Sequence, residues 1–94
     1  LKEALRFQEA GADMLLLECV SSAAAARVTA EVDVPVIGIG AGSDVDGQIL
    51  VLYDVIGVTQ GKLPRFAMNF AEAGRAPGDA VRDGSYPAAE HCFA

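Results

Sequence analysis

The sequence predicts an α/β fold in which parallel strands alternate with helices, and two observations support this fold. Short apolar runs without polar alternation follow helical segments, as expected of strands that are buried on both faces. The segments also follow one another in the order helix, strand, helix, strand with short links, which is typical of parallel βα units. The 94 residues are 52% hydrophobic and 21% charged, a globular composition that suffices for one small domain.

The first helix and strand are predicted from Leu1 to Leu17. Apolar residues recur at helical spacing from Leu1 to Ala10, and Gly11 is well placed to end this helix. The run Met14 to Leu17 has no polar residue, which favours a buried strand. This strand ends on a carboxylate, Glu18.

The second helix and strand follow directly. Ser21 or Ser22 is expected to cap an alanine-rich helix that continues to about Val32, because a serine hydroxyl can accept a hydrogen bond from a free amide of the first turn. After Asp33, the sequence VPVIGIG is rich in β-branched residues and predicts a second buried strand.

The pattern becomes ambiguous after the loop GAGSDVDG, residues 40–47. The apolar residues of QILVLYDVIGV could line one face of a helix. We favour a strand from Gln48 to Tyr53, because five successive apolar residues that end on Asp54 repeat the layout of LLLE. A helix is expected from Phe66 to Gly74, followed by a stretch interrupted by glycine and proline, residues 76–87, and a short tail.

Charge and cysteine content exclude several classes of protein. The net charge is -6, and the 7 basic residues are scattered, which argues against binding to nucleic acid. No apolar run approaches the roughly 20 residues that a membrane span needs. Cys19 and Cys92 lie far apart without a CxxC motif or a histidine pair, so we expect two free thiols in a reducing cytoplasm and neither a zinc site nor a disulfide.

Glu18 is the first candidate for chemistry. Functional groups of α/β proteins gather at the carboxyl ends of the strands, where Glu18 is predicted to lie. Its leucine neighbours are expected to exclude water, which would make the carboxylate a stronger general base. The alternative is a structural carboxylate that faces the amino terminus of the next helix.

The glycines of GIGAGS, Gly38, Gly40 and Gly42, suggest a dinucleotide fingerprint, but Ser43 stands where that motif requires glycine. Small residues here would let a ligand approach, or would simply form a tight turn.

Two further motifs are weaker candidates. DVDG, residues 44–47, resembles part of a calcium loop but lacks the third ligand and the distal glutamate, so we interpret it as a solvated turn. His91, the single histidine, is expected to be a surface residue of the tail.

The motifs GADMLLLECV, PVIGIGAG, DGQILVLYD, GVTQGKLPRFAMNF and YPAAEH, taken in order, resemble the C-terminal part of the ketopantoate hydroxymethyltransferase family. The resemblance implies a (β/α)8 barrel of the phosphoenolpyruvate/pyruvate type. Residues 1–94 would be a fragment of that single domain, about three βα units; consistent with this, the sequence does not begin with Met and opens within a helical pattern. Three parallel strands cannot close a barrel and would leave two edges unpaired.

The resemblance also implies a reaction. Members transfer a hydroxymethyl group from methylenetetrahydrofolate to 3-methyl-2-oxobutanoate, and Glu18 aligns with the proposed general base. Mg²⁺, chelated by the 2-oxo acid, would stabilise the enolate. Gly38, Gly40 and Gly42 would border the substrate, and the family forms homo-oligomers, namely decamers.

Two departures from the family pattern limit what this chain can do alone. The family's Mg²⁺ ligands and substrate lysine come from earlier strands, so no metal ligand is assigned here and the isolated chain is expected to be inactive. The segment from Ala80 to Gly84 is also shorter than usual. The alternatives are a non-catalytic truncated barrel fragment, or a different barrel enzyme that holds phosphate in its glycine-rich loop.

Overall fold

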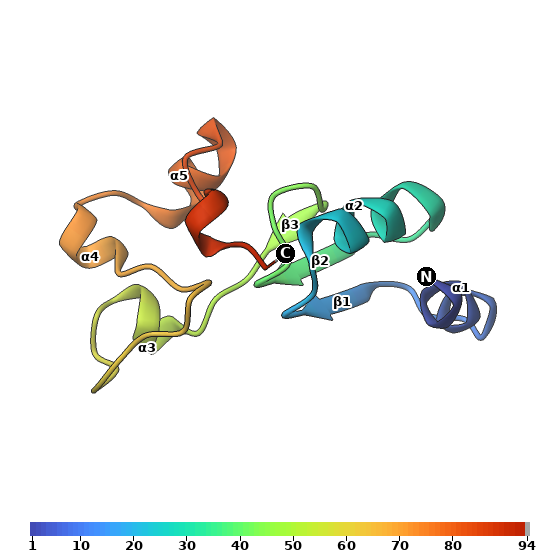
Figure 1. Cartoon of the computed structure of the whole chain (residues 1–94), viewed down its shortest axis with the longest axis horizontal. Helices are drawn as coiled ribbons and strands as arrows, with labels where there is room; N and C mark the ends of the chain where they lie inside the picture. The colour runs from blue at the N-terminus through green and yellow to red at the C-terminus, as the bar shows by residue number, and fades with distance from the viewer. Residues whose placement is uncertain (94) are drawn as a thin grey trace.

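The structure is a computed structural model that describes residues 1–93. Its elements are α1 (Lys2–Glu9), β1 (Leu15–Glu18), α2 (Ser22–Glu31), β2 (Val36–Ile39), β3 (Gly47–Gln48), α3 (Leu52–Val55), α4 (Phe70–Ala73), α5 (Pro77–Asp83) and the 3-10 helix η1 (Ala89–His91). The strands form one parallel sheet in the order β1, β2, β3 (Figure 1). The predicted α/β fold with three parallel strands is confirmed.

The first half of the chain folds as its sequence predicts. Leu15 stands in register with Val36, and Glu18 with Ile39. Ser21 is the N-cap of α2, and its hydroxyl oxygen accepts a hydrogen bond from the amide of Ala24 at 3.2 Å. A side-chain cap of this kind is worth about 1 kcal/mol.

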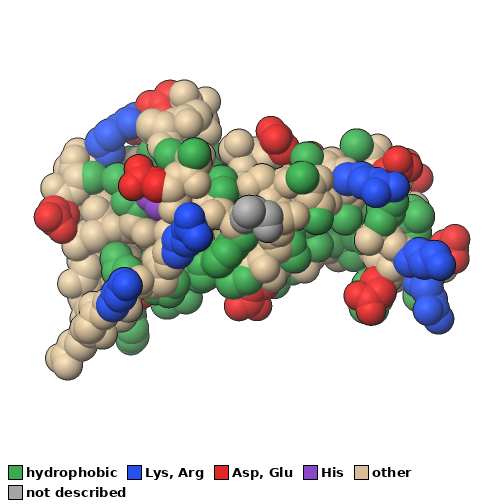
Figure 2. Space-filling view, in the orientation of Figure 1, with side chains coloured by type: hydrophobic (Ala, Val, Ile, Leu, Met, Phe, Trp, Pro, Cys, Tyr) green, Lys and Arg blue, Asp and Glu red, His purple; other side chains and the backbone are tan. Residues whose placement is uncertain are grey.

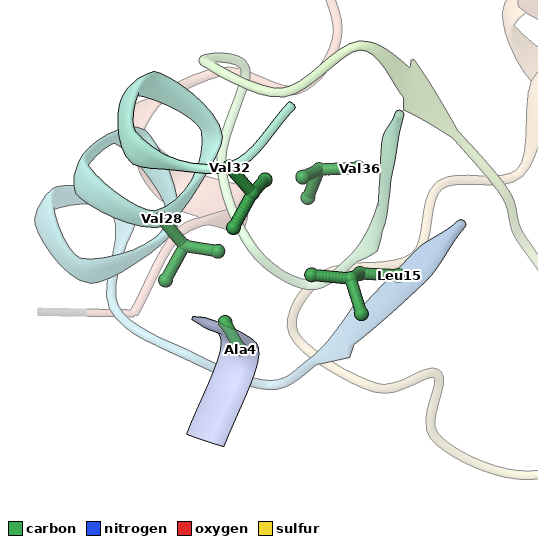
Figure 3. Close-up of a cluster of buried hydrophobic side chains, with 5 residues drawn as sticks. All are labelled: Ala4, Leu15, Val28, Val32 and Val36. Atoms are coloured by element: carbon green, nitrogen blue, oxygen red, sulfur yellow. The ribbon is translucent and has the colours of Figure 1, made fainter. Parts of the chain in front are cut away.

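One face of the sheet carries the main hydrophobic core. Helices α1 and α2 cover this face, and buried side chains from both helices point toward those of β1 and β2 (Figure 3). The buried cluster consists of Ala4, Leu15, Val28, Val32 and Val36. Val36 lies at its centre with no exposed surface.

Within residues 1–93, no helix covers the opposite face of the sheet, which we call the bare face. Side chains alternate along a strand, so the neighbours of the buried Leu15 and Val36 must point away from the core. Leu16 accordingly is 58% exposed, and Ile37 and Ile39 are only partly buried. Hydrophobic side chains line the lower side of the molecule, beneath the strands, in Figure 2.

The predicted strand from Gln48 to Tyr53 is wrong beyond its first residue. The amide of Ile49 donates the last sheet hydrogen bond, to the carbonyl of Gly38 at 3.0 Å. Because β2 ends at Ile39, it offers no further backbone hydrogen-bond partner to the residues after Ile49. The chain instead forms α3, and the helical pattern of its apolar residues prevails over the resemblance to LLLE.

The helix predicted from Phe66 to Gly74 is shorter than expected. It begins only at Phe70, because the side chain of Asn69 caps it by accepting from the amide of Glu72 at 3.1 Å. The next stretch, predicted to be interrupted, contains α5. Pro77 lies in the first turn of α5 and Gly84 follows its last residue, so these two residues mark the ends of the helix.

A second, smaller core joins these later elements. Phe70, Ala80 and Tyr86 are buried together, and the rings of Phe70 and Tyr86 pack edge to face with centroids 5.2 Å apart. Figure 1 shows α3, α4 and α5 gathered at one end of the molecule, away from α1. No helix within residues 1–93 combines the length and apolar character that crossing a membrane requires.

Candidate active site

Glu18 lies at the carboxyl end of β1, as predicted, next to Ile39 of β2. The expected exclusion of water by its leucine neighbours is not found, because Leu15 and Leu17 pack toward the helices and Glu18 points with the exposed Leu16 to the bare face. Its side chain is exposed, and among residues 1–93 it has no hydrogen-bond or ion-pair partner. Nothing in the described chain therefore uses this carboxylate for packing or pairing.

The amino terminus of α2 has other partners than Glu18. The hydroxyl of Ser21 accepts from the amide of Ala24, and the amide of Ser22 donates to the carbonyl of Phe93 at 3.2 Å. These hydrogen bonds involve other groups, and the alternative in which Glu18 faces the amino terminus of α2 and favours its dipole stays a prediction.

The turn after Glu18 begins with a residue in an uncommon backbone conformation. Cys19 has φ of 53°, in the left-handed region that costs a side chain about 1 kcal/mol. Its amide donates to the carbonyl of Ile39 at 2.9 Å, which fixes the sharp turn from strand to helix. Cys19 and Cys92 are both free thiols, as predicted.

A hollow of about 330 Å³ lies along the outer edge of β1. Its walls come from α1, β1 and the start of α2, and include Phe7, Leu16 and Glu18. The hollow is mostly apolar because the leucines of β1 have no neighbouring strand on this side. The carboxylate of Glu18 therefore borders a space that a further strand or a small ligand could fill.

The glycine-rich segment lies at the carboxyl end of β2, the middle strand of the sheet. A Cβ atom on Gly40 would come within 2.8 Å of the Phe66 ring, and one on Gly42 would come within 2.9 Å of Cβ of Ser22. Both residues also have left-handed φ angles, of 65° and 82°. The space beside Gly40 and Gly42 is thus occupied by Phe66 and Ser22 of the same chain. Contact with substrate through Gly38, Gly40 or Gly42 stays a prediction.

Gln48 is a further residue of the candidate site, and its sequence pattern did not predict it. Its side-chain Nε2 donates to the carbonyl oxygen of Gly42 at 2.6 Å. The only signal in the sequence is a lone glutamine just after the loop, in the motif DGQ.

Asp46 and His91 have structural roles. Asp46 accepts a hydrogen bond from the amide of Val36 at 2.8 Å, so this part of the calcium-like motif holds the start of β2. The interpretation of DVDG as a purely solvated turn is therefore incomplete.

His91 is not the surface residue that we expected. It is half-buried, its Nδ1 accepts from the amide of Ala88 at 3.0 Å, and its ring packs 4.9 Å from that of Tyr86. In residues 1–93 no three His, Cys, Asp or Glu side chains converge on a metal site.

Comparison with known proteins gives one consistent result. Residues 1–89 match the family described as ketopantoate hydroxymethyltransferase. A 3-methyl-2-oxobutanoate hydroxymethyltransferase from Chromohalobacter salexigens is 59% identical over 93 residues, which cover 90% of this chain and 35% of the relative. The relative of the same name from Marinobacter nauticus is 51% identical over 100 residues, covering 99% of this chain and 38% of its own length. The chain thus spans little more than a third of these relatives.

Proposed function

The chain belongs to the ketopantoate hydroxymethyltransferase family, and from this premise we propose that it is one part of an enzyme that makes ketopantoate for pantothenate biosynthesis. The complete enzyme would transfer a hydroxymethyl group from methylenetetrahydrofolate to 3-methyl-2-oxobutanoate. The names of the relatives support this reaction.

The segment would form the last third of a (β/α)8 barrel of the phosphoenolpyruvate/pyruvate type. Its helices cover only one face of a parallel sheet, as the outer helices of a barrel do. The bare face would then become the barrel interior. The two outer strands, β1 and β3, would find their partners in the remaining βα units, and the hollow beside β1 marks where one of them would lie.

The observation that carries the proposal is the position of Glu18. It ends a strand, points to the face that a barrel would enclose, and has no partner within the described residues. A carboxylate held in this way can act as a general base once the barrel surrounds it. It would accept the proton from the methine carbon beside the ketone, and the electron pair of that C–H bond would form the enolate that attacks the one-carbon unit.

The described residues do not form a Mg²⁺ site. Magnesium needs several oxygen ligands in octahedral geometry, and Glu18 is the single acidic side chain of the β1, β2 and β3 strands. Any Mg²⁺ of the complete enzyme would therefore take its protein ligands from the other strands of the barrel.

We further propose that the complete enzyme is a homo-oligomer of the cytoplasm. Two free thiols fit a reducing compartment. On α3, Leu52 is 64% exposed and Tyr53 is 62% exposed. Figure 1 shows α3 beyond the carboxyl ends of β1 and β2, and its exposed side chains would be available to another subunit.

A segment exchange tests the proposed function. The full-length Marinobacter relative, with its matching segment replaced by residues 1–94, is called the chimera below. We expect the chimera to form ketopantoate from 3-methyl-2-oxobutanoate and methylenetetrahydrofolate, and the same protein lacking the segment to form none. A chimera that melts cooperatively but makes no product would favour the non-catalytic truncated fragment.

A further inference from the structure

The side chain of Gln48 joins β3 to the glycine turn that follows β2. Its backbone is paired with β2, where Gln48 stands in register with Gly38. From this fixed position Nε2 reaches the carbonyl oxygen of Gly42, 2.6 Å away, in a part-buried setting. Within residues 1–93, no other hydrogen bond ties residues 40–45 to the rest of the chain. Gln48 is therefore the polar anchor of the glycine turn.

The turn that Gln48 anchors presses on the start of α2. The position of a Cβ on Gly42 lies 3.0 Å from Oγ of Ser22, which is the first residue of α2. On its other side the turn meets the ring of Phe66, through Gly40. A turn packed this closely on both sides cannot shift without moving its neighbours.

The start of α2 in turn leads directly to Glu18. Only the strained Cys19 and the two residues after it separate Glu18 from Ser22. A displacement of the glycine turn would therefore release the first turn of α2 and, through this short connection, change the direction of the Glu18 side chain.

We propose that Gln48 is a positioning residue for Glu18, acting through the hydrogen bond to Gly42 and the packing of Gly42 on Ser22. The inference rests on the proposed function, in which Glu18 is the base. Gln48 does not touch the reacting atoms in this account. It holds the turn whose packing fixes the strand-to-helix connection that carries the base.

The test compares three variants of the chimera. Gln48→Ala removes the side chain, and Gln48→Glu keeps its shape but loses the donor. Gln8→Ala is the matched control: Oε1 of Gln8 accepts from the amide of Asp33 at 2.5 Å, a similar bond located before β2, at the other end of the strands. Two quantities are measured, namely amide hydrogen exchange of residues 19–22 and 40–45, and exchange of the substrate's methine hydrogen with deuterated water.

Both Gln48 variants are expected to speed amide exchange in these two segments and to lower kcat for methine exchange by roughly 10- to 100-fold, the usual effect of a lost supporting contact. KM for the 2-oxo acid should change by less than about threefold, because binding groups elsewhere are untouched. Gln8→Ala should leave both segments and kcat near the parent values.

Two results would overturn the inference: unchanged amide exchange in the Gln48 variants, or a fall in kcat no larger than that of Gln8→Ala. A chimera without any methine exchange would contradict the proposed function instead. The amide exchange of residues 19–22 would then decide alone whether Gln48 controls the connection next to Glu18.

Discussion

Glu18 and Ile39 stand side by side at the carboxyl ends of β1 and β2, on the bare face of the sheet. The pair places one carboxylate at the edge of an otherwise apolar surface that includes Leu16 and Ile37. Packing does not require a charge at this position, and no neighbour in residues 1–93 neutralises it. The arrangement is understandable if further strands cover the apolar part and leave the carboxylate at the mouth of the resulting barrel.

The bare face predicts that residues 1–94 are unstable when expressed alone. Leu16, Ile37 and the unpaired edges of the sheet would face water and promote association. We expect a broad, non-cooperative melting curve or aggregation, measured by circular dichroism and analytical ultracentrifugation. A sharp transition in a monomer would contradict the idea that other strands complete this sheet.

The isolated chain is also expected to bind Mg²⁺ no better than a generic acidic surface. Hard cations need several converging oxygen ligands, and the described residues bring no three carboxylates together. Isothermal titration of residues 1–94, with the chimera as a positive control, checks this. A stoichiometric and tight site in the isolated chain would show that the metal ligands lie here and not in other strands.

Tyr86 is expected to make stability depend on pH in the alkaline range. Burial and, as a smaller cause, the negative charge of a Cys92 thiolate together raise the pKa of Tyr86 from 10.0 to about 12. The Tyr86 hydroxyl ionises near pH 10 in the unfolded chain and only near pH 12 in the folded chain. The contribution of Tyr86 to the free energy of unfolding is therefore complete below pH 10 and is lost as the pH rises toward 12.

The variant Tyr86→Phe tests this in the chimera. It lacks the hydroxyl that donates to the carbonyl of Phe66 and should lose about 1 kcal/mol at pH 8. The deficit should shrink between pH 10 and 12, as followed by urea denaturation. The parent chimera, measured over the same pH range, is the control. A deficit that stays constant across this range would contradict the assignment.

The parts of the fold that were predictable are those fixed by local signals. The runs of β1 and β2 are apolar without alternation, and the cap at Ser21 depends on a contact three residues away. The prediction of a strand from Gln48 to Tyr53 was wrong for a non-local reason, because the length of β3 depends on where its partner β2 ends. The helix α5 was missed because its proline and glycine were interpreted as interruptions, although they mark its ends.

The candidate site shows the same division. The strand-end rule located Glu18 correctly from sequence alone. Its exposure was not predictable from its leucine neighbours, because alternation along β1 turns Leu15 and Leu17 to the opposite face. Gln48 gave no periodic signal, since its role depends on a hydrogen bond across a turn that only the folded chain creates.

The variant Glu18→Gln tests whether Glu18 is the general base. In the chimera this change keeps the shape of the side chain but removes its ability to accept the substrate proton. Glu31→Gln, an exposed glutamate at the end of α2, is the matched control. The measurement is exchange of the methine hydrogen of 3-methyl-2-oxobutanoate with deuterated water, followed by NMR in the presence of Mg²⁺. We expect that Glu18→Gln still binds the 2-oxo acid but exchanges this hydrogen roughly 10²- to 10⁴-fold more slowly, whereas Glu31→Gln exchanges it at the parent rate. Exchange by Glu18→Gln as fast as by the parent would show that Glu18 is not the base.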